Sequence, residues 1–253
     1  MQKNSTFSLP LPSQKTGFEH LKKIIWEFYA SNGRRLPWRY ESDPYKVFIS
    51  EIMLQQTQVS RVLVKYPLFI ERFPTLATLA TAPFSELLSA WQGLGYNRRA
   101  LFLHKATQEI MAKYAGQIPH DPAILKTLPG IGPNSAGSVA AFAYNKPVAF
   151  IETNIRSVFI HFFIPKEEKV SDKALMSLIQ ATIDQKNPRD WYYALMDYGV
   201  FLKTNIENPS RQSLHYTKQS KFEGSDRQIR GMILRLLTKQ KQANKEELLE
   251  QIN

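Results

Sequence analysis

The sequence Leu128-Pro129-Gly130-Ile131-Gly132-Pro133-Asn134-Ser135-Ala136-Gly137 places two glycines between two helical patterns. Upstream, three apolar residues are spaced as on one face of a helix: Ile124, Leu125 and Leu128. Downstream, Pro133 suits the first turn of another helix. The pattern predicts a helix, a glycine hairpin and a second helix. Because glycine leaves backbone amides uncovered, such a hairpin can receive phosphate oxygens, although taken alone it also fits a plain tight turn.

Composition narrows the classes of function. The chain has 253 residues, no cysteine, five histidines and a formal net charge of +11. The lack of cysteine excludes disulfides, thiol catalysis and cysteine-held zinc or iron–sulfur centres, and the scattered histidines argue against another metal site. The positive charge suits a polyanionic partner. No apolar run is long enough to span a bilayer, and residues 1–17 lack the apolar stretch of a signal peptide. We expect a monomer of the cytoplasm or nucleoid, without membrane contact.

Helical periodicity runs through most of the chain, and strand alternation is nearly absent, so an all-α fold is predicted. Residues 1–17 are expected to form a polar tail. The last part, 223–253, has a capping-box pattern at Ser225 to Gln228. It fits either the start of a winged-helix unit or an ordinary helical tail. The predicted helices cover 18–30, 44–54, 59–73, 83–91, 98–114, 171–183 and 188–202.

Glu51 is the first candidate for chemistry. On a helix its neighbours Val47, Phe48 and Leu54 are apolar, so the carboxyl is expected to face the apolar side. Burial disfavours the charged form of a carboxyl group, and one that stays protonated near neutral pH can act as a general acid. The structural alternative is a carboxylate that caps a neighbouring helix or pairs with a buried arginine.

Several other side chains suit contacts with nucleic acid. The amides after Glu51 include Gln55 and Gln56, which can wedge into a duplex or bind base edges. Tyr96 follows a glycine turn and precedes two arginines, an arrangement typical of base stacking beside phosphate contacts. The alternatives are polar residues at a helix end and core packing of the tyrosine. Basic residues that could bind phosphate are Arg34, Arg35, Arg98, Lys218 and Lys221, which a set of solvated helix faces would also explain.

A resemblance to a known family joins these segments. In chain order they resemble the helix-hairpin-helix (HhH-GPD) base-excision DNA glycosylases, and within them the MutY-type adenine glycosylases. The likeness covers about residues 18–220. The segments are Leu36-Pro37-Trp38-Arg39, Asp43 to Val47, Ser50 to Val59, Trp91 to Tyr96, Leu103 to Ala106, Leu128 to Gly137 and Met196-Asp197-Tyr198-Gly199.

The resemblance implies roles for individual residues. Glu51 matches the acid that protonates a flipped adenine. Glu152, twenty residues past Gly132, falls where the family has its catalytic aspartate, and Asn154 matches an asparagine that orders the site. The longer side chain of Glu152 must fold back, or the sugar must sit differently. Residues implied to contact DNA are Gln55, Gln56 and Tyr96, inserted into the stack, and the hairpin residues Leu128, Gly130, Ile131, Gly132 and Ser135.

Two departures from the family pattern carry predictions. Asn134 stands where lyase-active relatives have a nucleophilic lysine, so base removal without strand cleavage is expected. The four positions that align with iron–sulfur ligands hold no cysteine, so no cluster is expected in the loop 203–219; they are Lys203, Ser210, Ser213 and Gln219. We expect this loop to be held instead by packing of Leu214, Tyr216 and Phe222.

Together these points predict a glycosylase core over 18–222, with DNA crossing a cleft between two helical lobes. One lobe is a helical barrel, 43–145, and the other joins 18–42 to 146–222. The expected activity is removal of adenine opposite 8-oxoguanine or guanine in double-stranded DNA, without lyase activity. The alternatives are a glycosylase for T:G and U:G mismatches with the same fold, and an inactive protein that binds DNA lesions.

Overall fold

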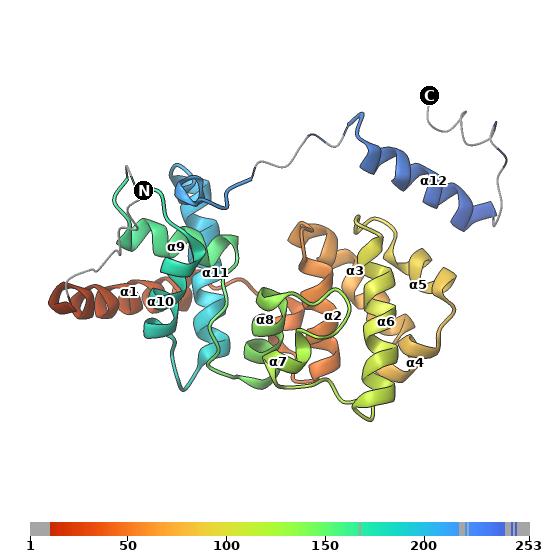
Figure 1. The fold of residues 1–253 in the computed structure, drawn as a ribbon, viewed down its shortest axis with the longest axis horizontal. Helices are drawn as coiled ribbons and strands as arrows, with labels where there is room; N and C mark the ends of the chain where they lie inside the picture. The colour runs from red at the N-terminus through yellow and green to blue at the C-terminus, as the bar shows by residue number, and fades with distance from the viewer. Residues whose placement is uncertain are drawn as a thin grey trace, which may run out of the picture. The chain divides into compact units, whose positions relative to one another are not determined.

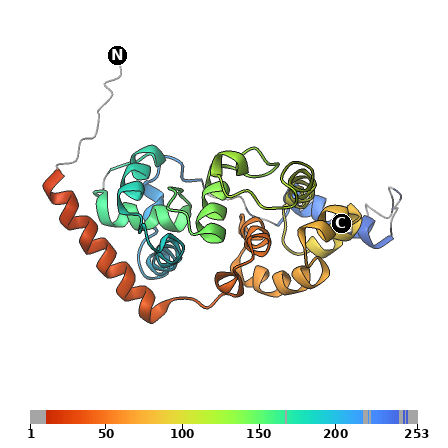
Figure 2. The ribbon, with the colours of Figure 1, turned by 90° about the horizontal axis from the view of Figure 1, so that it is seen from below.

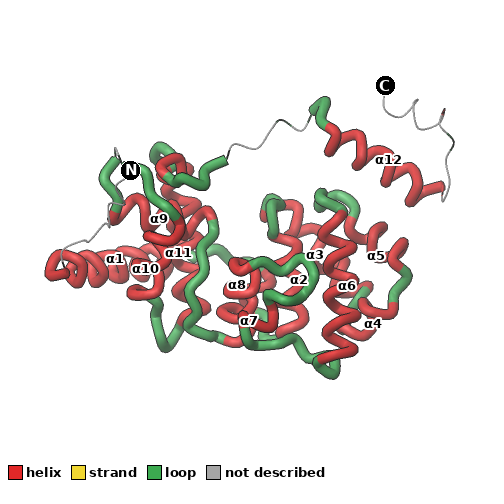
Figure 3. The backbone as a smooth tube through the Cα atoms, in the orientation of Figure 1, coloured by secondary structure: helices red, strands yellow, loops and turns green. Residues whose placement is uncertain are grey.

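The computed structural model describes residues 11–166, 168–217, 221, 223–240, 244 and 246. Over these residues the regular elements are helices, and extended pairing is limited to one isolated bridge between Val170 and Ser213 (Figure 3). The all-helical class predicted from the sequence is confirmed. The elements, labelled in Figure 1, are α1 (Leu11–Asn32), η1 (Pro37–Tyr40), α2 (Pro44–Leu54), α3 (Val59–Arg72), α4 (Leu76–Thr81), α5 (Phe84–Trp91), α6 (Arg98–Lys113), α7 (Pro122–Leu125), α8 (Pro133–Tyr144), α9 (Thr153–Phe163), α10 (Asp172–Thr182), α11 (Pro188–Asn205), η2 (Pro209–Gln212) and α12 (Asp226–Gln240).

The chain divides into two compact units. Unit 1 holds the described residues up to Arg35 together with Asn145–Thr217, and unit 2 holds Leu36–Tyr144 together with the described residues after Thr217. From the sequence, residues 36–42 are expected beside the N-terminal helix, whereas they belong to unit 2. The reason is that Trp38 of η1 is buried and packs edge-on against Tyr66 of α3, with ring centroids 5.7 Å apart.

Unit 1 is built around α9, whose apolar residues at helical spacing are fully buried: Ile155, Val158 and Phe159. Both α1 and α11 pack against α9 and against each other. Trp26 of α1 meets Trp191 of α11 at a ring-centroid distance of 5.7 Å. Burying these faces provides most of the driving force for the unit, because apolar area removed from water is the dominant favourable term in folding.

Unit 2 is built around α2, which is apolar on most of its surface; Phe48, Ile49 and Met53 are fully buried. Asp43 caps its N-terminus by accepting a hydrogen bond from the N–H of Tyr45 at 2.9 Å. The helix lies beside α8, as Figure 1 shows. The alanines of α8 are small, which lets the two backbones approach closely. The C-terminal end of α2 is thereby held next to the N-terminal turn of α8.

The two ends of the described chain differ from the sequence-based expectation. Helix α1 begins at Leu11, inside the segment expected as a polar tail, and Figure 2 shows it as one unbroken rod. Pro12 lies in its first turn, where the missing N–H of proline is not needed. At the other end, α12 forms where the capping box was predicted: the N–H of Gln228 donates to Ser225 Oγ at 3.4 Å. None of the described helices combines the length and apolar character needed to cross a membrane.

Candidate active site and DNA-binding surface

The glycine hairpin forms as predicted between α7 and α8. Gly130 has a φ of +77°, a left-handed conformation that side chains disfavour, and a Cβ there would lie 2.7 Å from Cβ of Phe102. Gly132 has open space around it and does not have a positive φ. Gly130 is therefore required by both backbone and packing, whereas Gly132 leaves room for another molecule to approach the N-terminus of α8.

The residues that flank the hairpin divide into supporting and exposed ones. The side chains of Leu128 and Ile131 are buried, so they hold the hairpin against the core and present no side-chain surface to DNA. Arg98 is exposed, and its guanidinium lies over the ring of Phe102, 5.0 Å from the centroid. Because Phe102 also lies under Gly130, a positive charge stands beside the hairpin. This is the electrostatic setting that favours a bound phosphate.

Gln55 and Gln56 follow the C-terminus of α2 and have different surroundings. Gln55 donates from Nε2 to Ser135 Oγ in the first turn of α8 at 2.9 Å. Gln56 is exposed and has a φ of +52°. Left-handed backbone in a residue other than glycine is strained and persists only where the surroundings hold it, which often marks a functional site. The structure thus places one amide against the hairpin helix and the other at the surface.

Arg99 is one of the two arginines expected from the sequence to hold phosphate beside Tyr96, and in the structure its guanidinium joins the loops of this surface. Its NH1 donates to the carbonyls of Ile52 and Met53 in the last turn of α2, and its NH2 donates to Thr57 Oγ1 at 2.7 Å. The same NH2 donates to the carbonyls of Leu94 and Gly95. Burial lowers the pKa of Arg99 to about 10, which leaves the guanidinium charged at neutral pH.

Tyr96, like Gln56, has a left-handed backbone, and it lies beside Arg99. Its φ is +47°, and its side chain is 37% exposed, in line with the predicted exposure. The guanidinium of Arg99 lies 5.7 Å from the ring centroid, and NH1 of Arg227 on α12 donates to the Tyr96 hydroxyl at 2.9 Å. Two cations therefore surround one exposed aromatic ring. Arg227 was not among the predicted site residues, since nothing local links it to position 96.

Glu51 lies in the last turn of α2. It is half-buried, while its chain neighbours Ser50 and Ile52 are buried. The negative end of the helix dipole disfavours an ionised carboxylate there, although the charge of Arg99 on the next two carbonyls offsets part of this effect. Glu51 is therefore accessible in part to solvent. That is suitable for a group that must exchange a proton with something outside the protein.

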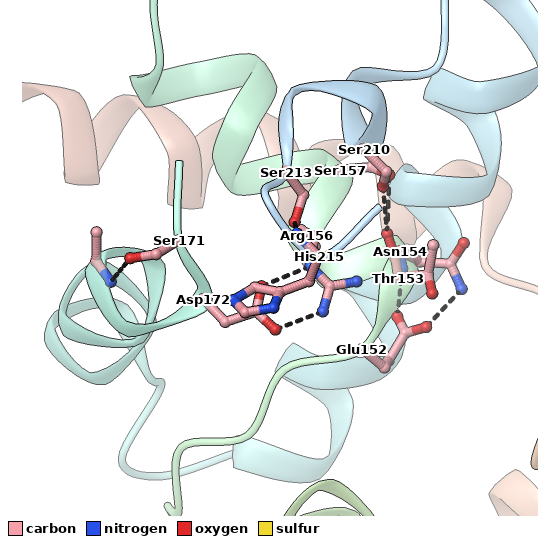
Figure 4. Close-up of polar contacts among 11 residues, drawn as sticks. Glu152, Thr153, Asn154, Arg156, Ser157, Ser171, Asp172, Ser210, Ser213 and His215 are labelled. Carbon is pink, nitrogen blue, oxygen red and sulfur yellow. Dashed lines mark hydrogen bonds and ion pairs between the residues drawn. The ribbon is translucent and has the colours of Figure 1, made fainter. Parts of the chain in front are cut away.

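Glu152 lies at the other kind of helix end from Glu51, at the N-cap of α9 (Figure 4). Its Oε1 accepts hydrogen bonds from the backbone N–H groups of Asn154 at 2.8 Å and Ile155 at 2.9 Å, and its Oε2 accepts one from Asn154 Nδ2 at 3.1 Å. These donors and the positive end of the helix dipole stabilise the charged carboxylate. The longer side chain folds back onto its own helix, one of the two possibilities that the sequence left open.

Around Glu152 a set of polar contacts fixes the first turn of α9. Arg156 forms a two-pronged ion pair with Asp172 of α10, with N···O distances of 2.8 and 2.7 Å, and this hydrogen bonding lowers the pKa of Asp172. Ser157 Oγ lies 2.6 Å from Ser210 Oγ of η2 (Figure 4). The turn that carries Glu152 is thus held by both α10 and η2.

The positions that align with iron–sulfur ligands do not fit such a cluster. Lys203 Nζ donates to Asn154 Oδ1 at 2.8 Å. Ser210 donates to the carbonyl of Thr153 at 3.1 Å, and Ser213 Oγ accepts from the N–H of His215 at 3.1 Å. Hydroxyl and ammonium groups lack the thiolate that holds iron, and the chain has no cysteine. Within the described residues no group of three or more histidine, cysteine or acidic side chains is placed to hold a metal.

The prediction that apolar packing holds this loop is wrong where it can be examined. Leu214 and Tyr216 are 65% and 42% exposed, and Phe222, like Gln219, lies outside the described residues. The loop is held by hydrogen bonds instead. The N–H of Leu214 donates to the carbonyl of Val170, and Gln212 Nε2 donates to that of Pro165 at 2.8 Å. A polar side chain such as Gln212 finds carbonyl acceptors in the neighbouring backbone, so hydrogen bonds hold the loop in place of apolar contacts.

The remaining residues predicted to act at the site are Arg34, Arg35, Asn134, Lys218 and Lys221. Arg34 is tied by its N–H and Nε to the buried carboxylate of Asp197, so it has a structural role in unit 1. Arg35, Lys221 and Asn134 are exposed, whereas Lys218 lies outside the described residues. Contacts of the exposed residues with DNA stay predictions. The ion pair joins Arg34 to Asp197, which lies 163 residues further along the chain in the segment Met196-Asp197-Tyr198-Gly199.

These features describe a helical protein that presents a glycine hairpin, a basic surface and an N-capped acid. Residues 49–181 match the HhH-GPD superfamily of base excision DNA repair proteins, and the chain belongs to that superfamily. It is 37% identical over 187 residues to an adenine DNA glycosylase of Buchnera aphidicola subsp. Baizongia pistaciae, covering 72% of this chain and 53% of the relative. An adenine DNA glycosylase of Mycobacterium tuberculosis is 34% identical over 257 residues, covering 90% and 82%.

Two solved structures share the fold. A thermostable thymine-DNA glycosylase matches with a TM-score of 0.72 at 24% identity, over 79% of this chain and 93% of the other. An endonuclease III in a non-covalent DNA complex matches with a TM-score of 0.62 at 16% identity, over 77% and 97%. The chain spans about half the length, 53%, of the Buchnera relative.

Proposed function

We propose that this protein is a DNA N-glycosylase that removes adenine opposite 8-oxoguanine or guanine from duplex DNA. The observation that carries the proposal is the contrast between two acids: a half-buried Glu51 at the end of α2, and Glu152, which accepts three hydrogen bonds at the N-terminus of α9. Its relatives at 34–37% identity are adenine DNA glycosylases. A glycosylase of this type needs one proton donor and one anion, and the chain offers both.

The reaction follows from these two environments. Glu51 donates a proton to a ring nitrogen of the flipped adenine, which turns the base into a better leaving group. The bond between C1′ and the base then breaks, and its electron pair leaves with the adenine. Glu152 stabilises the positive charge that develops on the deoxyribose, and water adds at C1′ to give an abasic site. Asn154 keeps the Glu152 carboxylate oriented through its hydrogen bond.

DNA binding is proposed to use the surface of unit 2. The hairpin at Gly130 and Gly132 and the N-terminal turn of α8 take phosphate oxygens, with Arg98 beside them. Gln56 and Tyr96 are exposed on strained backbone and are suited to insertion between bases. Asn134, an exposed amide, cannot form a Schiff base, so the product keeps an intact strand.

The test is release of free base from four duplexes that contain A:8-oxoguanine, A:G, T:G or U:G. We expect release from the first two and an intact phosphodiester backbone afterwards. Release of thymine or uracil with adenine retained would replace the proposal with a mismatch glycosylase. Binding without release from any duplex would identify a non-catalytic lesion-binding protein.

A further inference from the structure

One contact near Glu152 has no role in the reaction as described. Lys203 of α11 lies 49 residues from Asn154 in the chain, and its Nζ donates a hydrogen bond to Asn154 Oδ1 at 2.8 Å. The other end of the same side-chain amide, Nδ2, donates to Glu152 Oε2 at 3.1 Å. A continuous chain of two hydrogen bonds thus leads from an ammonium group on α11 to the proposed reactive carboxylate.

The chemistry of lysine decides which way the Asn154 amide faces. An amide has an acceptor oxygen and a donor nitrogen of nearly the same shape, so it can bind in either of two orientations. The lysine ammonium has donors only, so the atom facing Lys203 must be the oxygen. The amide nitrogen Nδ2 is then turned toward Glu152, whose Oε2 accepts its hydrogen bond. In the reversed orientation two oxygens, Asn154 Oδ1 and Glu152 Oε2, would face each other.

A second residue of α11 acts on the backbone of Asn154. Gly199 is buried, and a Cβ at this position would collide with the carbonyl oxygen and Cβ of Asn154. Gly199 and Lys203 are four residues apart on one helix, so they share one face. The glycine lets the helix backbone lie against Asn154, and the lysine holds its side chain. The first turn of α9 is therefore placed by this face.

The surroundings of the lysine agree with this geometry. Burial lowers the pKa of Lys203, the negative charge of Glu152 raises it, and the nearby Arg156 lowers it further. The side chain is largely enclosed by the protein, so its ammonium is best satisfied by its polar neighbours rather than by bulk water.

We propose that Lys203 and Gly199 form a positioning face on α11 that sets the orientation of Asn154 and, through it, the carboxylate of Glu152. The inference rests on the proposed glycosylase function for its effect on the reaction. The geometric part, the orientation of the Asn154 amide, holds independently of that function. Lys203 is a positioning residue and does not touch the reacting atoms.

The principal test is Lys203→Met, which keeps the length and apolar stem of the side chain and removes the donor. We expect single-turnover adenine release to slow by about 10-fold, the lower end of what loss of an outer hydrogen-bond partner costs. Affinity for the uncleaved duplex should not change. Lys203→Arg keeps a donor-only group and should restore the rate to within about threefold of the original protein.

A double-substitution cycle shows whether the lysine acts through Asn154. If it does, Lys203→Met should have little further effect on the rate once Asn154→Ala is present, because coupled residues give non-additive effects. Thr204→Ala is the matched control. Thr204 is exposed beside Lys203 on α11, and its hydroxyl donates to the carbonyl of Val200 in the same helix, so the substitution should leave the rate unchanged.

Failure of this inference can be told apart from failure of the proposed function. The side-chain amide protons of Asn154, identified by NMR in comparison with Asn154→Ala, should shift in Lys203→Met and return in Lys203→Arg whether or not the protein releases adenine. Unchanged amide signals and an unchanged rate in Lys203→Met would overturn the inference. So would a borohydride-trapped DNA adduct on Lys203, which would make the lysine a nucleophile. Lack of adenine release by the original protein would overturn only the proposed function.

Discussion

Unit 2 presents Glu51 from the last turn of α2, whereas unit 1 presents Glu152 from the residue before the first turn of α9. The two side chains carry the same functional group. At the end of α2 the helix dipole and the apolar neighbours disfavour negative charge, while at the start of α9 the dipole and three hydrogen bonds favour it. The comparison teaches that the position of a carboxyl group within a helix decides which backbone groups and which end of the dipole it meets.

The two surroundings also differ in how they are built. Around Glu152 the fixed groups are polar and come from four segments, α9, α10, α11 and η2. At the end of α2 the half-buried guanidinium of Arg99 joins the carbonyl of Ile52 to two loops. The turn that carries Glu152 is therefore held by several hydrogen bonds, whereas the end of α2 and its neighbouring loops share the guanidinium of Arg99.

The largest effect is expected from Glu51→Gln, which removes the proposed proton donor and keeps the size of the side chain. Adenine release in single-turnover assays should fall roughly 100- to 10,000-fold, the range of general acid catalysis. Duplex affinity should hold, and Glu71→Gln on the exposed face of α3 is the control. Full activity in Glu51→Gln would break the assignment of the two acids.

Glu152→Gln tests the other half of the comparison. The amide can still accept from the N–H groups at the start of α9, so the helix should stay capped while the negative charge is lost. Loss of charge stabilisation should slow release by about 100-fold. In contrast, Glu152→Asp keeps both charge and cap, and its rate should stay within about tenfold of the original. If both variants were equally slow, side-chain length rather than charge would be the decisive property.

The dependence of unit 2 on one guanidinium is tested by comparing neighbours. Arg99→Met leaves several buried carbonyls without a donor and should lower the free energy of unfolding by about 2–4 kcal/mol, measured by urea denaturation. Arg98→Met, at the exposed adjacent position, should change stability by less than about 0.5 kcal/mol.

DNA binding should depend more on Arg98 than on Arg99, which is the reverse of the order expected for stability. If Arg98 contacts a phosphate, Arg98→Met should reduce the slope of log affinity against log salt by about one. A similar loss of stability in both variants would contradict the different roles that the structure gives them.

The smallest effect concerns the acid sensitivity of unit 1. Hydrogen bonding to Arg156 lowers the pKa of Asp172, so this contact stabilises the fold above the ordinary pKa of aspartate and is lost as the pH falls through the lowered value. Asp172→Asn should lower stability at neutral pH by less than about 1 kcal/mol, because the pair is partly exposed. The difference from the original protein should shrink in urea titrations below about pH 4. Glu86→Gln, in the exposed Arg72–Glu86 pair, should show a smaller difference throughout.

Some of this site could be predicted because its signals are local. The glycine spacing indicates the hairpin, the apolar period indicates α2, and Glu152-Thr153-Asn154 has the pattern of a helix start. Helix α9 itself was not among the predicted helices, although its apolar residues Ile155, Val158 and Phe159 follow helical spacing. The loop 203–219 was expected to be held by packing, since sequence shows which residues are apolar but not which have something to pack against.

The sequence by itself determined the helical class, the hairpin and the two candidate acids, because periodicity and turn chemistry act over a few neighbouring residues. Only the tertiary structure decided that Arg99 is half-buried while Arg98 is exposed, and that Lys203 meets Asn154 across 49 positions. Contacts of that kind depend on how helices from distant segments pack. Which residue a side chain contacts is then set by how these helices pack rather than by its neighbours in the chain.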